Sequence, residues 1–209
     1  MTAPAAQTVT GRRGPYRKTR EVRERILEAG LEVFAQSGYR KGSLREIAER
    51  VDMSEAGLLH HFPSKSALLL ALLEHRDNRS RELVDLESEC GLETLAGLVR
   101  LARYNADRPG VVELYCVLSA EATSPSHPAH DYFVERYRTM RESIGATLEE
   151  VRRAGHLRDG VDPYRAACRL LAIWDGLQVQ WLLDRDSLDM ADDLADYLHR
   201  ILTVRLPGI

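Results

Sequence analysis

Apolar side chains recur at intervals of three and four residues along most of this chain, which is the spacing of one face of an α-helix. No segment alternates apolar and polar residues as a half-buried strand does, and no segment repeats another. Short stretches that contain proline, glycine and aspartate interrupt the helical pattern. The pattern therefore predicts an all-α protein of about nine helices.

Six of the expected helices lie in the second part of the chain. They run from Ala67 to about Glu87, Thr94 to Ala106, Val111 to Ala122, Ala129 to Ala154, Pro163 to about Leu183, and about Asp189 to Val204. Asp162 before Pro163 gives an N-cap followed by proline at the first helical position. The segment from Val111 is apolar on most sides, so we expect it near the centre of the fold.

Two short capped helices precede them, in the segment SLREIAERVDMSEAGLLHHFPSK. Ser43 and Glu46 form an S-x-x-E capping box, which predicts a helix that begins at Leu44. Ser54 is the N-cap of a second helix that ends near His61, before Pro63 and a third capping serine, Ser64. Two capped helices joined by a tight turn form the helix-turn-helix unit, whose second helix enters the major groove of DNA.

Charge is divided unevenly between the two ends of the chain. Residues 1–65 hold 12 Lys or Arg and 8 Asp or Glu, a net charge of +4, whereas the rest of the chain has a net charge of −7. We expect residues 1–18 to be a flexible basic arm that attracts phosphate without reading sequence, the alternative being a solvated tail. The basic side chains are densest at Arg12, Arg13, Arg17, Lys18, Arg20, Arg23 and Arg25.

The segment of capped helices, SLREIAERVDMSEAGLLHHFPSK, resembles the TetR family of bacterial regulators. The matching positions are Ser43, Ile47-Ala48, Asp52-Met53-Ser54, Leu58-Leu59, His61-Phe62 and Ser64-Lys65, with Ile26 to Gly30, Phe34 and Gly38-Tyr39 upstream. The resemblance implies a helix-turn-helix DNA-binding domain over 19–65, with its motif at about 43–62. It also implies a regulatory ligand-binding and dimerisation domain over 66–209.

Contacts with double-stranded operator DNA follow from this resemblance. It presents Ser54, Glu55, Ala56, Gly57 and His60 toward the groove and places His61 and Lys65 at phosphate. Ser43, and Arg17 and Lys18 in the arm, complete the expected DNA-binding residues. Arg45 is the long cationic side chain that is able to pair bidentately with a guanine.

The helix after Pro163 is apolar over a wide arc, which fits a core, a pocket wall or an interface between two copies. The resemblance favours a homodimer interface formed by the last two long helices, with Leu170, Leu177, Trp181, Leu194 and Leu198 in it. Gly176 would let two backbones approach closely, at a cost in helix propensity of ~1 kcal/mol.

The resemblance also places an effector pocket among the helices from Thr94 to Leu183. The candidate lining residues are Tyr104, Tyr115, Leu118, Glu121, Phe133, Tyr137, Met140, Trp174 and Gln178. Several phenols and one carboxylate suit a small, mostly apolar ligand that carries a few polar groups.

Other classes of protein find little support. No apolar run approaches the ~18 residues needed to span a bilayer, and there is no signal-peptide core, so we expect a cytoplasmic protein. Cys90, Cys116 and Cys168 are scattered, and we expect buried thiols without a disulfide. His127 and His130 flank a proline-rich break, where capping is a better interpretation than metal binding. We expect no cofactor and no metal.

The sequence thus predicts a DNA-binding transcriptional regulator, most simply a repressor that a ligand releases from a palindromic operator. One alternative is a constitutive DNA-binding protein without ligand control, from which a measurable pocket would distinguish it. Another is a small all-α enzyme, against which stands the absence of any G-x-S-x-G, G-x-G-x-x-G, P-loop or H-E-x-x-H motif.

Overall fold

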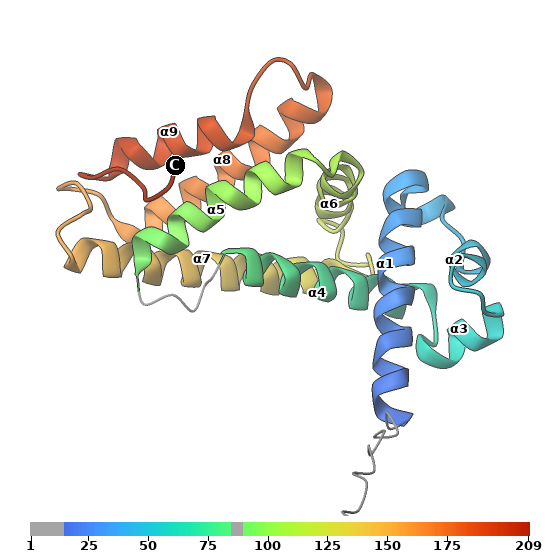
Figure 1. Ribbon diagram of the computed structural model, residues 1–209. Coiled ribbons are helices and arrows are strands. Elements are labelled where there is room, and N and C mark those ends of the chain that lie inside the picture. Colours follow the sequence, from blue (N-terminus) through green and yellow to red (C-terminus); the bar gives the residue numbers. More distant parts are fainter. Residues whose placement is uncertain (1–14, 85–89) are drawn as a thin grey trace, which may run out of the picture.

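The computed structural model describes residues 15–84 and 90–209, and over these ranges it is built of nine α-helices (Figure 1). They are α1 (Pro15–Lys41), α2 (Leu44–Arg50), α3 (Glu55–His61), α4 (Lys65–Val84), α5 (Gly91–Ala106), α6 (Pro109–Glu121), α7 (His130–Arg153), α8 (Pro163–Leu183) and α9 (Met190–Ile201). The pairing of Leu157 with Leu202 is an isolated β-bridge. The predicted all-α fold is confirmed.

The predicted helix ends are close to the observed ones, with three differences. α5 and α6 begin a little earlier than predicted, at Gly91 and Pro109. α9 ends at Ile201, because the chain turns there to pair Leu202 with Leu157. The predicted end of α4 at Glu87 lies outside the described residues.

The expected basic arm is shorter than predicted, because α1 already begins at Pro15. Proline fits the first turn of a helix, where its missing N–H costs nothing. Residues 1–14 of the arm lie outside the described part of the chain. The helical path of α1 breaks at Gly38, where the family's first helix was expected to end, and the φ of 72° there is one that glycine adopts readily; the short piece to Lys41 follows this kink.

The three predicted serine caps are confirmed. Ser43 Oγ accepts a hydrogen bond from the Glu46 amide at 3.0 Å, and Ser54 Oγ accepts one from Gly57 at 3.1 Å. Ser64 Oγ accepts from the Ala67 amide at 3.0 Å, at the start of α4. Each cap satisfies a helix N-terminal N–H group, which is why such short helices as α2 and α3 have fixed ends.

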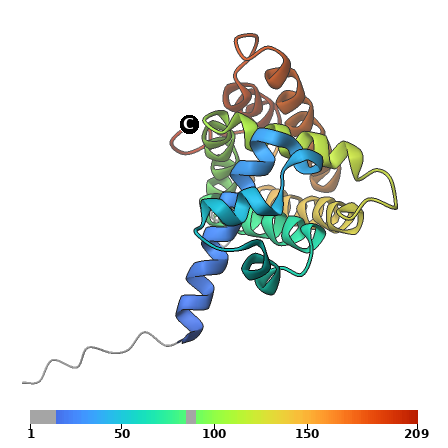
Figure 2. The same ribbon diagram turned by 90° about the vertical axis from the view of Figure 1, so that its right-hand side faces the viewer.

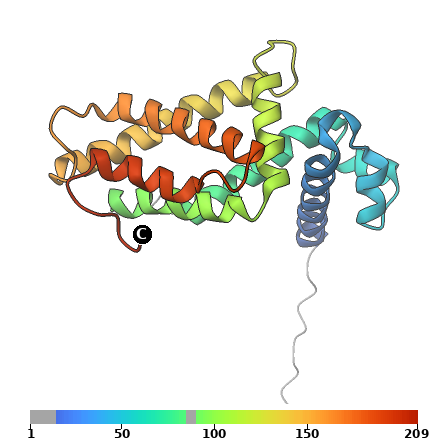
Figure 3. The same ribbon diagram turned by 90° about the horizontal axis from the view of Figure 1, so that it is seen from above.

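Two hydrophobic cores lie at the two ends of the molecule. The helix triplet, α1 to α3, packs around Ile26, Phe34, Ile47 and Leu58, and this core continues into α4, α6 and the start of α7. The helical bundle, α5 to α9, has a second core, with α8 packed against α6, α7 and α9. Figures 1 and 2 show the triplet at one end of the bundle, with α4 leading from one to the other. Figure 3 shows α8 and α9 side by side along the bundle.

Two glycines let helices touch through their backbones. A Cβ added at Gly97 in α5 would lie 2.3 Å from the carbonyl oxygen of Val84 in α4. A Cβ at Gly110 in α6 would lie 3.2 Å from the Cβ of Ala35 in α1. The α4–α5 crossing therefore has no room for a larger residue, and the α1–α6 contact would have to yield by a few tenths of an ångström.

The cysteines are less buried than predicted. Cys90 is exposed at the start of α5, and Cys116 and Cys168 are half-buried. None of the three forms a disulfide. Within the described ranges, no helix combines the length and the apolar character that crossing a bilayer requires.

Candidate DNA interface and ligand pocket

The surface of α3 is open along most of its length. Leu58 is its one fully buried residue, while Ser54, Glu55, Ala56 and His60 are exposed. Gly57 and His61 are partly covered. Because the triplet holds α3 through a single buried side chain, the rest of the helix is available to a DNA groove.

Arg45 and Ser43 lie on the adjoining surface of α2. The Arg45 Nε pairs with Glu49 Oε1 at 2.8 Å, one turn further along the helix, and both side chains are largely exposed. Such a surface pair contributes little to stability, so a base or phosphate is able to displace it. The Ser43 hydroxyl is engaged in its cap. The contacts of Ser43, Arg45 and α3 with DNA stay predictions.

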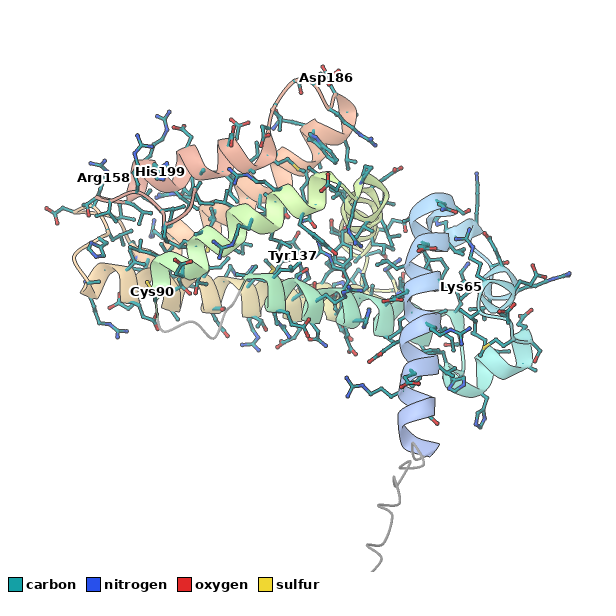
Figure 4. All side chains as sticks on the ribbon, viewed as in Figure 1. Lys65, Cys90, Tyr137, Arg158, Asp186 and His199 are labelled. Carbon is teal, nitrogen blue, oxygen red and sulfur yellow. The ribbon has the colours of Figure 1, made fainter. Side chains whose placement is uncertain are left out.

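The two residues expected at phosphate are both tied to the triplet. Lys65 Nζ donates to the Arg40 carbonyl at 3.0 Å and lies 4.9 Å from the centre of the Tyr39 ring, between α1 and α4 (Figure 4). Desolvation lowers the pKa of Lys65, and desolvation together with His60 and Arg23 lowers the pKa of His61. His61 is therefore a neutral hydrogen-bonding group at neutral pH rather than a cation.

Two arginines of the predicted basic cluster brace the motif. Arg23 Nη1 donates to the His61 carbonyl at 2.7 Å, and its guanidinium lies 4.2 Å from the centre of the Phe62 ring. Arg25 donates to the Val51 carbonyl at 2.9 Å. Both satisfy carbonyls at the ends of α2 and α3, a role that sequence reasoning missed. The side chains of Arg17 and Lys18 lie outside the described part, although their backbone belongs to α1.

The bundle contains two adjoining cavities. The apolar lobe, about 160 Å³, lies among Val84, Leu98, Leu101, Ile144 and Leu170. The aromatic lobe, about 180 Å³, is lined by Tyr115, Cys116, Phe133, Tyr137, Asp175 and Gln178. Arg76, Arg136, Met140, Leu171 and Trp174 line both lobes, so together these cavities form one divided pocket.

Most of the predicted pocket residues meet there. Tyr115, Phe133, Tyr137, Trp174 and Gln178 line the aromatic lobe, and Met140 lies between the lobes. Figure 4 shows Tyr137 in the interior of the bundle. Its hydroxyl donates to Asp175 Oδ2 at 2.7 Å, and desolvation raises the pKa of that carboxyl.

Three predicted pocket residues lie elsewhere. Leu118 is fully buried in the core that α6 shares with the helix triplet. Glu121 faces away from the lobes, since it pairs with Arg40 at 3.3 Å. Tyr104 lines a cleft between α1, α4, α5 and α6. They were wrong because helical spacing shows which positions share a face but does not show which neighbour covers that face.

Sequence reasoning missed the charged side chains of the pocket. Asp77 accepts a hydrogen bond from Tyr132 at 2.5 Å and pairs with Arg136 at 2.7 Å and Arg76 at 3.5 Å. The signal was present in α4, where Arg76 follows Leu72 and Leu73 at helical spacing and so falls on the apolar face.

The predicted interface residues face inward. Leu170, Trp181, Leu194 and Leu198 are buried in the bundle core, and Leu177 is packed against it. The four buried side chains are enclosed by their own chain, whereas Leu177 is partly exposed, so the predicted interface stays a prediction. The outer face of α8 carries Ala172, Gly176, Val179 and Leu183 instead, with Leu183 83% exposed.

The two histidines considered for metal binding cap the break before α7. His127 accepts from the Ala129 amide at 3.2 Å, and His130 Nδ1 lies 2.8 Å from the Ala122 carbonyl oxygen. Among the described residues no three histidine, cysteine or carboxylate side chains are grouped as metal ligands.

Comparison with known proteins agrees with this architecture. Residues 26–72 match the model of the bacterial regulatory proteins of the tetR family, and residues 105–203 match that of the C-terminal region of BetI-type transcriptional repressors. The regulatory protein RaaS of Mycobacterium tuberculosis is 30% identical over 84% of this chain and 78% of its own. The regulator TtgR of Pseudomonas putida is 27% identical over 87% and 90%.

A solved structure gives the same result. A transcriptional regulator of Saccharomonospora viridis, in complex with choline, superposes with a TM-score of 0.73 at 27% identity, over 88% of this chain and all of that one. The matched proteins are DNA-binding transcriptional regulators and not enzymes. The chain therefore belongs to the TetR family of bacterial transcriptional regulators.

Proposed function

We propose that this protein is a homodimeric, cytoplasmic repressor that binds a palindromic operator and is released from it by a small effector in the divided pocket. The course of α4 carries this proposal. Its first residue, Lys65, contacts the helix triplet, and further along Arg76 and Asp77 line the pocket. One continuous helix thus joins the two sites, without a flexible linker between them.

The pocket favours a regulator that a ligand controls, rather than a protein that binds DNA constitutively. Its walls are mostly apolar, with a few convergent polar groups, as in small-molecule sites generally. The Saccharomonospora relative was solved with a small molecule bound, which favours the same mode of control here. A ligand that fits only the arrangement unable to bind DNA would draw the population toward that arrangement.

The outer face of α8 supports a dimer. Gly176 costs helix propensity in the middle of α8, yet a Cβ there would meet nothing closer than 4.0 Å within the chain. Val179 and Leu183 leave apolar surface open beside it. A second copy related by a twofold axis would cover this face and would present two α3 helices to half-sites ~34–36 Å apart.

Selection from random DNA duplexes tests the proposed function. We expect the purified protein to enrich a palindrome, and a compound from a metabolite library to lower its affinity for that palindrome. The operator must then weaken binding of the compound by the same factor, because coupling is reciprocal. Enrichment of asymmetric sites, or an operator affinity that no compound changes, would favour a constitutive DNA-binding protein.

Arg45→Ala is expected to relax sequence preference. A bidentate contact with guanine discriminates by ~1–3 kcal/mol, so one position of each half-site should lose most of its preference. Competition binding against operators changed at single positions measures it. Arg200→Ala is the matched control, since Arg200 is also exposed and pairs one helical turn away, with Asp196 at 2.9 Å. Unchanged preference in Arg45→Ala would remove this residue from base reading.

A further inference from the structure

Two arginines at the junction of the lobes share one carboxylate. Asp77 Oδ2 lies 2.7 Å from Arg136 Nη1, and Asp77 Oδ1 lies 3.5 Å from Arg76 Nη1. Arg76 and Asp77 are each more than nine-tenths buried, and the Arg136 side chain is 17% exposed. This buried cluster therefore holds two positive charges and one negative charge.

Arg76 is poorly satisfied by its own chain. Its polar contacts, with Asp77 and with Asn105 Oδ1, are 3.5 and 3.4 Å long. Its guanidinium also lies 4.3 Å from the centre of the Tyr115 ring. A guanidinium carries five N–H donors in a planar fork, so Arg76 retains donors for a further acceptor.

The other charges around the pocket leave this excess in place. Arg81 also lines the apolar lobe, where Asp77 is the one carboxylate among the lining residues that the structure describes. Asp175 lines the aromatic lobe instead, and its Oδ2 accepts a hydrogen bond from Tyr137. Arginine side chains thus lie at the polar end of the apolar lobe, and the rest of its wall is mostly apolar, with Ser80, Thr139 and Ser143 among it.

We propose that the effector is an amphipathic organic anion, whose carboxylate binds between Arg76 and Arg136 and whose apolar body fills the apolar lobe. This inference rests on the proposed function and names the class of its ligand. A carboxylate accepts paired N–H bonds from a guanidinium fork and neutralises the excess charge of the cluster. A quaternary ammonium, such as the choline bound by the Saccharomonospora relative, would meet repulsion at this position.

Three probes with similar apolar bodies test the class of ligand. Octanoate, 1-octanol and octyltrimethylammonium carry straight alkyl chains of seven, eight and eight carbons and differ chiefly in their head group, and titration calorimetry measures the affinity of the full-length protein for each. We expect octanoate to bind at least about tenfold more tightly than octanol, as a charge-assisted hydrogen bond of about 1.5–3 kcal/mol would give. The ammonium should bind more weakly than octanol. Equal affinities, or a preference for the ammonium, would overturn the proposal.

Removing a positive charge and removing a negative charge should change the affinity for an anion in opposite directions. This difference separates anion binding from a structural role of the cluster. Arg136→Gln should weaken octanoate at least about tenfold, whereas Asp77→Asn should tighten it, because it removes the competing carboxylate. Octanol affinity should change little in either variant. A merely structural role would weaken both ligands in both variants, which would contradict the proposal. Arg81 is exposed, so Arg81→Gln keeps the test open if a buried variant does not fold, and it should weaken octanoate about two- to threefold.

Operator binding distinguishes the proposed anion site from the proposed control of the repressor by a ligand. If octanoate binds and lowers operator affinity, both proposals are supported. If octanoate does not bind but another compound releases the operator, the anion proposal is wrong and the ligand-controlled repressor stands. If octanoate binds with the expected charge dependence while operator affinity stays constant, the anion site stands and ligand control is wrong.

Discussion

Ala172→Arg is expected to convert the protein into monomers that bind the operator at least about 100-fold more weakly. Ala172 lies exposed near the middle of α8, on its outer face. In a twofold dimer an arginine there would face its own copy, so two like charges would be buried together without a partner. Each monomer would still bind one half-site but would lose the gain from tethering a second α3. Sedimentation velocity and operator titration measure the two effects.

Val134→Arg is the matched control for this substitution. Val134 is 57% exposed on α7 and is not part of the proposed face of α8, so an arginine there should leave the oligomeric state and operator affinity unchanged. Neither position is buried within its own chain, so neither arginine should disturb the fold of that chain. A wild-type protein that sediments as a monomer at micromolar concentration, or an Ala172→Arg variant that stays dimeric, would contradict the proposed interface.

Gly97→Ala is expected to destabilise the protein by about 2–3 kcal/mol, although alanine is the better helix former. The added Cβ would lie 2.3 Å from the Val84 carbonyl oxygen, a backbone atom that moves only with α4. For a chain of this size the melting temperature should fall by roughly 5–10 °C. Thermal unfolding followed by circular dichroism provides the measurement.

Gly145→Ala supplies the comparison with the same chemical change. Gly145 lies inside α7, and a Cβ there would meet Tyr164 at an ordinary contact distance of 3.7 Å. This variant should therefore gain stability, by about 0.5–1 kcal/mol from helix propensity. Equal melting temperatures for the two variants would mean that the α4–α5 contact is looser than the structure shows.

The parts of this fold that were predictable from sequence are those that local interactions determine. The three serine caps and the breaks at Gly38 and Pro63 depend on residues within a few positions of one another. The pattern of capped helices therefore predicted α2 and α3 nearly to the residue.

The pocket and the interface depended on contacts between distant segments. Tyr132 and Arg136 reach Asp77 from more than fifty positions away, and no local pattern couples them. The wide apolar arc of α8 fits a core, a pocket wall or an interface between copies, and the family resemblance favoured the interface. Three helices cover this arc, so Leu170 and Trp181 lie in the core of the single chain. Periodicity shows how much of a helix is apolar, whereas only packing shows what lies against each side.

The contact of Gly97 with Val84 fixes α4 at the end opposite the helix triplet. A rotation of α4 as a rigid helix would therefore be centred on this contact. The 20 residues of α4 span about 30 Å. A rotation of about 5° at Val84 would move Lys65 by about 2.6 Å, as that length requires. Two such helices related by a twofold axis would change the separation of the recognition helices by up to about 5 Å, against a half-site spacing of ~34–36 Å. Hydrogen bonds to bases tolerate only a few tenths of an ångström, so a displacement of this size would be enough to end the reading of DNA.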